Sequence, residues 1–114
     1  MNAFRAFLAA VFLVIAAYTL VVVANHGLNL LPVFFGDMTK MQWPGQFNLD
    51  FMCMLLLSGL WVSWRHQFSV AGVVLGLVAV FGGALFLSVY LLVESFRAKG
   101  DSQTLLMGAA RASQ

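Results

Sequence analysis

Five side chains that can carry chemistry lie near the ends of long apolar segments of the chain: His26, Asn48, Asp50, Tyr90 and Glu94. Two carboxylates, an imidazole and a phenol that share a partly dry pocket could exchange protons or bind a ligand. The alternative is that each group lies hydrated among lipid headgroups and marks a helix end, because shallow placement costs little. The sequence leaves both interpretations open.

The sequence predicts no metal site and no cofactor. His26, Asp50 and Glu94 are suitable ligand types, but they have no motif spacing. Thioether and thiol groups in residues 52–54 would suit Cu(I), and three spans with a methionine motif look like the copper transporter family. That family spaces its methionines four apart on one helical face, whereas Met52 and Met54 point to different sides of a helix. We therefore expect these methionines to be packing residues.

The chain contains no catalytic motif, so we expect no enzymatic activity. The patterns G-x-S-x-G, H-E-x-x-H, C-x-x-C and the phosphate-binding loop are all missing from the sequence. Hydrophobic residues make up 62% of the chain and charged residues 9%, against about 25% charged residues in a soluble domain. The net charge of +2 comes without a basic cluster and does not indicate nucleic-acid binding. The composition predicts one membrane domain, residues 1–114, in contact with the lipid bilayer.

Helices must position these side chains, because a backbone in hydrocarbon has to satisfy its own hydrogen bonds. Residues 68–93 contain no Asp, Glu, Lys, Arg or His, which is well beyond the ~18 apolar residues that mark a membrane span. We predict an all-α, integral membrane fold with three transmembrane helices. Their approximate ranges are 4–24, 46–64 and 68–93, with an interfacial loop at 25–45 and a polar tail at 94–114. The short link at 65–67 predicts that spans two and three form an antiparallel hairpin.

The first span resembles a signal peptide, because Arg5 precedes a long apolar run. The run exceeds the roughly 7–15 residues of a secretory apolar core, so we expect an uncleaved anchor. Three crossings place Arg5 and Arg65 on one side of the membrane and the other Lys and Arg residues on the opposite side. Since the first helix usually sets orientation, we expect the amino terminus inside and the tail outside.

A stripe of small residues marks the third span. Gly72, Gly76, Ala79 and Gly83 recur at helical spacing, and small residues let helix backbones approach closely. Either span two of the same chain or a second copy of the chain could fill this seam. Tyr90 and Glu94 continue the stripe, so we expect them to turn inward. Aromatic and basic residues at the ends of the second span are predicted interfacial anchors: Trp43, Trp61, Trp64 and Arg65.

Three parts of the chain together resemble small, uncharacterised three-span membrane proteins of bacteria. They are residues 43–51 (WPGQFNLDF), residues 59–65 (GLWVSWR), and Gly82-Gly83 followed by residues 90–92 (YLL). The resemblance implies a bacterial inner-membrane location and no known activity. It also marks Asp50, Arg65 and Tyr90 as positions to test.

Two functions are consistent with these features. The first is a non-enzymatic scaffold or accessory subunit, acting as a homo-oligomer or within a larger membrane complex and packing through the glycine-rich helix. The second is an oligomeric transporter or channel that couples to protons or cations through His26, Asp50 and Glu94.

Overall fold

The computed structural model describes residues 1–112, and over this range it contains helices and no strand. Three helices are long and apolar enough to cross a membrane, which confirms the predicted fold class and is compatible with an integral membrane protein. The helices are α1 (Asn2–His26), α2 (Leu30–Thr39), α3 (Trp43–Arg65), α4 (Val70–Arg97), α5 (Ser102–Met107) and α6 (Ala109–Ala112).

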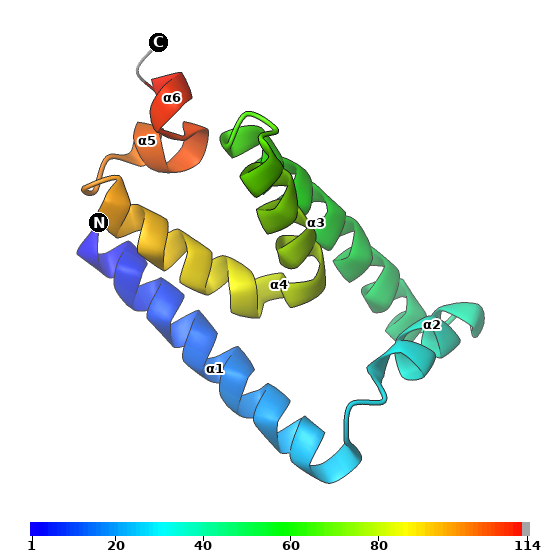
Figure 1. Cartoon of the computed structure of the whole chain (residues 1–114). Coiled ribbons are helices and arrows are strands. Elements are labelled where there is room, and N and C mark those ends of the chain that lie inside the picture. Colours follow the sequence, from blue (N-terminus) through cyan, green and yellow to red (C-terminus); the bar gives the residue numbers. More distant parts are fainter. Residues whose placement is uncertain (113–114) are drawn as a thin grey trace.

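Helices α3 and α4 form the predicted antiparallel hairpin, and glycines bring their backbones together (Figure 1). A Cβ on Gly76 would meet the Ser63 hydroxyl and, at 2.7 Å, the Gly59 carbonyl oxygen. A Cβ on Gly59 would lie 2.8 Å from the Gly76 carbonyl oxygen, so each glycine makes room for the other. At the hairpin turn, a Cβ on Gly72 would lie 2.5 Å from the His66 Cβ. Span two of the same chain therefore fills the predicted seam.

Helix α4 is broken at Gly83. This residue has φ 57° and ψ −142°, a backbone conformation that only glycine adopts readily. The break faces α3, where a Cβ on Gly83 would touch the ring of Phe51 and a methyl group of Leu55. It divides α4 into two halves of about 20 Å each, at ~1.5 Å per residue. We call them the first half (residues 70–82) and the second half (residues 84–97).

The second half of α4 turns back toward the carboxyl end of α3 (Figure 1). Tyr90 packs in a buried cluster with Val62 and Ala79, and its ring meets Trp61 edge-on at 6.3 Å between centroids. Both the start and the end of α4 therefore lie near Arg65. Three crossings in series predict that Arg65 and Arg97 are separated, whereas the structure pairs both of them with Glu94.

Helix α1 packs chiefly against α4 and has no substantial contact with α3. Arg5 fixes the pairing, because its guanidinium donates to the Ser95 hydroxyl and to the Ser95 carbonyl oxygen, each at 3.0 Å. The same guanidinium lies over the Phe96 ring, 4.0 Å from the centroid. The amino end of α1 thus lies with the end of α4, whereas three crossings in series would separate these two ends.

The predicted interfacial loop contains α2, which folds back onto the start of α3. Gly45 permits the contact, since a Cβ there would collide with the Asp37 carbonyl oxygen. Asn48 donates from its side-chain amide to the Phe34 carbonyl oxygen at 3.0 Å.

Candidate functional site

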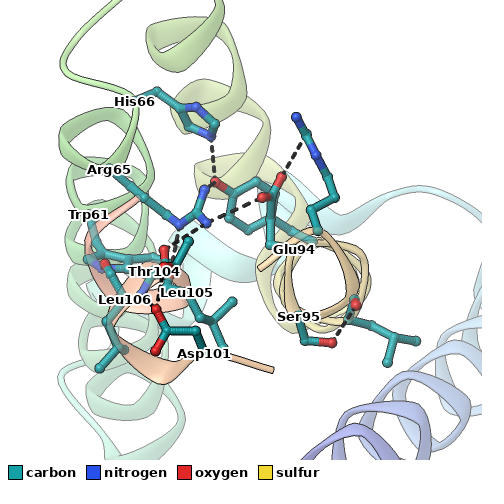
Figure 2. Close-up of polar contacts among 12 residues, drawn as sticks. Trp61, Arg65, His66, Glu94, Ser95, Asp101, Thr104, Leu105 and Leu106 are labelled. Atoms are coloured by element: carbon teal, nitrogen blue, oxygen red, sulfur yellow. Dashed lines mark hydrogen bonds and ion pairs between the residues drawn. The ribbon is translucent and has the colours of Figure 1, made fainter. Parts of the chain in front are cut away.

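Arg65 lies at the centre of a buried polar network where α3, α4 and α5 meet (Figure 2). It is the last residue of α3 and only 6% exposed. Its guanidinium pairs with the Glu94 carboxylate at 3.3 Å and donates to the Tyr90 hydroxyl at 3.2 Å. Two further bonds go to α5, to the carbonyl oxygens of Leu105 at 2.6 Å and Thr104 at 3.3 Å. We call Arg65 with these four partners the arginine clasp.

The clasp holds three elements with one side chain. Planar guanidinium geometry allows Arg to bond several acceptors at once, which Lys cannot reproduce. Carbonyl oxygens in the last turn of α5 accept two of these bonds, and the Thr104 oxygen also accepts from the Gly108 backbone amide at 2.9 Å. The guanidinium therefore adds a donor at a helix end, where carbonyl groups lack partners within the helix. A buried cation without such partners would be strongly destabilising.

His66 extends the clasp through Tyr90. The His66 Nε2 atom lies 2.6 Å from the Tyr90 hydroxyl, which already accepts a hydrogen bond from Arg65. The tyrosine has one hydroxyl hydrogen, so it donates that hydrogen to Nε2 when the imidazole is neutral. Burial, and then the charge of Arg65, lower the pKa of His66 below its ordinary 6.5. Geometry and electrostatics therefore both favour a neutral histidine with its proton on Nδ1.

Glu94 is 7% exposed and is paired on both carboxylate oxygens. Arg65 holds Oε2, and Arg97, one turn further along α4, holds Oε1 at 3.2 Å. The Arg97 side chain is 71% exposed, so its pair with Glu94 contributes little to stability. Two guanidinium groups around one carboxylate leave an excess of one positive charge.

The tail packs against α3 through backbone acceptors as well. Trp61 donates from its indole nitrogen to the Leu106 carbonyl oxygen at 3.1 Å. Arg111 donates to the Trp64 carbonyl oxygen at 3.2 Å and lies over the Trp64 ring. Asp101 caps α5 by accepting from the Thr104 backbone amide at 3.2 Å. The tail is therefore a docked element with the buried residue Leu105.

A cavity of about 310 Å³ opens beside the clasp, between the carboxyl ends of α3 and α4 and the tail. Polar side chains on its wall include Arg65, His66, Glu94, Arg97 and Thr104. The wall carries a net positive charge when His66 is neutral. We call this space the clasp cavity.

The structure does not gather the five predicted polar residues. Tyr90 and Glu94 belong to the clasp, whereas His26, Asn48 and Asp50 lie toward the other end of the molecule. His26 and Asp50 are exposed, and Asn48 is used to hold α2. The return of α4 at Gly83 separates Glu94 from Asp50, so the structure does not form the shared pocket that was one of our two alternatives. The transporter hypothesis stays a prediction, with no gathered His26–Asp50–Glu94 site behind it.

The predicted anchors have different surroundings. Trp43 is 72% exposed, as an interfacial anchor would be. Trp61 and Trp64 instead hold the tail, and Arg65 is buried, so its predicted role as an anchor is wrong. A second cavity of about 540 Å³, next to Trp43, is mainly apolar and is lined by Met38, Met41 and Leu49 among others.

Sequence reasoning missed His66, Arg97 and Arg111 as parts of a site. The tripeptide Trp64-Arg65-His66 at a span end carried a signal, because an arginine beside an apolar segment needs partners if it is buried. The partners are 25 to 40 residues distant in sequence and could not be assigned without the turn at Gly83.

The fold and the clasp define a small all-helical protein with three potential membrane-spanning helices and a polar network at one end. Comparison with protein-family models, with curated proteins and with solved structures finds no match.

Proposed function

We propose that this chain is a non-enzymatic scaffold or accessory subunit of a membrane complex, which binds a transmembrane helix of its partner through α1. The single observation that carries this proposal is an unpartnered alanine seam on α1. Alanines recur every seven residues, and all four are exposed: Ala3, Ala10, Ala17 and Ala24.

The seam has the pattern of a helix–helix interface. The intervening positions Ala6, Leu13 and Leu20 are exposed too, which completes a heptad repeat with small residues at every first position. Small residues at this spacing allow close backbone approach, and packing drives helix association where lipid offers no hydrophobic gain. Leu8, on the opposite face, is the buried residue of α1. The helix therefore uses one face within the chain and keeps the other for a partner.

The packing of the glycine seam on α4 also supports α1 as the helix that binds a partner. Gly59 and Gly76 already pack against each other inside the α3–α4 hairpin, so this seam is not open to a second copy. Our earlier hypothesis of assembly through span three is therefore replaced by assembly through α1.

The distribution of basic residues supports one orientation of the chain in the membrane. Of the six Lys and Arg residues, five lie at the clasp end: Arg5, Arg65, Arg97, Lys99 and Arg111. Lys40 lies at the other end, 3.8 Å from Asp37. The excess of basic residues favours a cytoplasmic location for the clasp end. Together with the resemblance to small bacterial membrane proteins, this supports the bacterial inner membrane.

Cysteine crosslinking in native membranes tests the proposal. Cys53 is first replaced by Ser, and Cys is then introduced at Ala17 or at Thr19, which is also exposed but lies off the seam. We expect a discrete crosslinked product from position 17 and little from position 19. Ala17→Ile should weaken assembly, by about 1–3 kcal/mol, whereas Thr19→Ile should not. The mass of the product separates a second copy from a different subunit, and a strict monomer at both positions would refute the proposal.

A further inference from the structure

We propose that the clasp cavity binds the phosphate of an anionic phospholipid headgroup. The cavity of about 310 Å³ has room for a headgroup phosphate, and it lies between the ends of α3 and α4. These are two of the helices that are apolar enough to lie in a bilayer, so their ends fall at headgroup depth. The inference does not rest on the assembly role proposed for α1.

Charge complementarity identifies the ligand as an anion. Arg65 and Arg97 both line the cavity, and Glu94 is the one carboxylate among its lining residues. Glu94 already has an arginine on each carboxylate oxygen, at 3.3 and 3.2 Å. Because two cations share one anion, a bound phosphate would complete the charge balance of the cavity.

Arg97 is the residue best placed to bind the phosphate directly. Its one hydrogen bond within the described residues uses a terminal nitrogen, donating to Glu94. The remaining N–H groups of this exposed guanidinium can donate to phosphate oxygens in a bidentate manner. The Arg65 guanidinium, in contrast, already bonds to Tyr90, Glu94 and α5. Its positive charge on the cavity wall would still attract the phosphate.

Neutral donors on the wall fit the same ligand. His66 uses Nε2 toward Tyr90, and its neutral form carries a proton on Nδ1. The Gln67 side-chain amide, also on the cavity wall, can donate to a phosphate oxygen. The basic residues around the cavity attract the anionic lipids of a cytoplasmic leaflet, each by about five-fold in affinity.

Native mass spectrometry of the purified full-length protein tests this inference. The probes are phosphatidylglycerol, phosphatidylcholine and inorganic phosphate, each titrated separately. We expect phosphatidylglycerol to be retained more strongly than phosphatidylcholine, and Arg97→Gln to weaken its binding about five-fold. Arg97→Lys keeps the charge and should restore part of the loss. Lys40→Gln removes an exposed cation at the other end and should have no effect.

Three outcomes would decide against the inference. Equal retention of the two lipids would show that the cavity does not select an anion. An equal effect of Arg97→Gln and Lys40→Gln would place the lipid site elsewhere. Binding of inorganic phosphate without binding of phosphatidylglycerol would assign the cavity to a soluble ligand. Loss of assembly through α1 with lipid selectivity intact would leave this inference standing and refute the proposed function alone.

Discussion

Replacing Arg65 by Met removes the centre of the clasp while keeping a side chain of similar length. The substitution deletes the ion pair with Glu94 at 3.3 Å and the bonds to Tyr90, Thr104 and Leu105. Glu94, which is 7% exposed in the native structure, would keep Arg97 as its one partner, and the Arg97 side chain is itself 71% exposed. The variant therefore leaves a buried carboxylate without its buried partner and the Leu105 carbonyl oxygen without the guanidinium. The Thr104 carbonyl oxygen keeps the Gly108 backbone amide as a donor.

The expected loss is about 3–5 kcal/mol, because removing one partner of a buried ion pair leaves the other charge uncompensated. A second substitution, Glu94→Gln, removes that charge. The double variant should then be more stable than the sum of the two single losses predicts, with a coupling energy of about 2 kcal/mol. Lys40→Met, at an exposed pair with Asp37, should change stability by less than about 0.5 kcal/mol.

Reversible unfolding in mixed micelles with increasing sodium dodecyl sulfate measures these free energies, with intrinsic tryptophan fluorescence as the readout. Trp61 and Trp64 both contact the tail, so their signal also reports its release. A loss of less than about 1 kcal/mol for Arg65→Met would mean that the clasp is hydrated and not a buried pair. Strict additivity of the two substitutions would show that Arg65 and Glu94 are energetically independent. Either result would refute the reasoning.

Three further predictions concern the hairpin, the histidine and the topology. Gly76→Ala should destabilise the protein by about 1–3 kcal/mol, since its Cβ would meet the Ser63 hydroxyl, whereas Gly36→Ala faces open space and should be tolerated in the same unfolding assay. The pKa of His66 is lowered in the folded protein, so the unfolded chain binds more protons below about pH 6.5. The free energy of unfolding should therefore keep its full value above that pH and fall as the pH drops toward the folded pKa of His66. In unfolding curves recorded from pH 8 to about pH 5, His66→Gln should remove this dependence. Reporter fusions at the two termini should report the same side of the membrane, because Arg5 bonds to Ser95. The excess of basic residues at the clasp end predicts that this side is cytoplasmic. Fusions on opposite sides would contradict the return of α4 at Gly83.

The helices could be predicted from the sequence because apolar length is a local property. An apolar run as long as residues 68–93 predicts helix in hydrocarbon, and α4 follows this prediction from Val70 apart from the break at Gly83. The antiparallel pairing of α3 and α4 also followed from the short link between them. The change of direction within α4 could not be predicted from the sequence, because Gly82-Gly83 is equally consistent with a packing seam and with a turn. Only the positive φ at Gly83 separates the two interpretations.

The candidate site was predicted only in part for the same reason. Tyr90 and Glu94 do turn inward as expected, but their partners are Arg65 and His66 and not His26 and Asp50. A helical period places residues on a face of one helix, and it carries no information about which end of a neighbouring helix that face meets. The alanines of α1 recur with a seven-residue period in the sequence, and the structure adds that all four are exposed.

The clasp also constrains how the nascent chain matures. A ribosome adds Arg65 well before it adds Glu94, Thr104 and Leu105, so the emerging guanidinium has none of its final acceptors yet. During this interval the arginine has to stay in water or against lipid phosphates, since an unpaired charge is excluded from hydrocarbon. Insertion of α3 to its final depth is therefore coupled to the synthesis of residues 94–105. The second half of α4 and the tail would therefore pack against α3 together, in one late step of biogenesis.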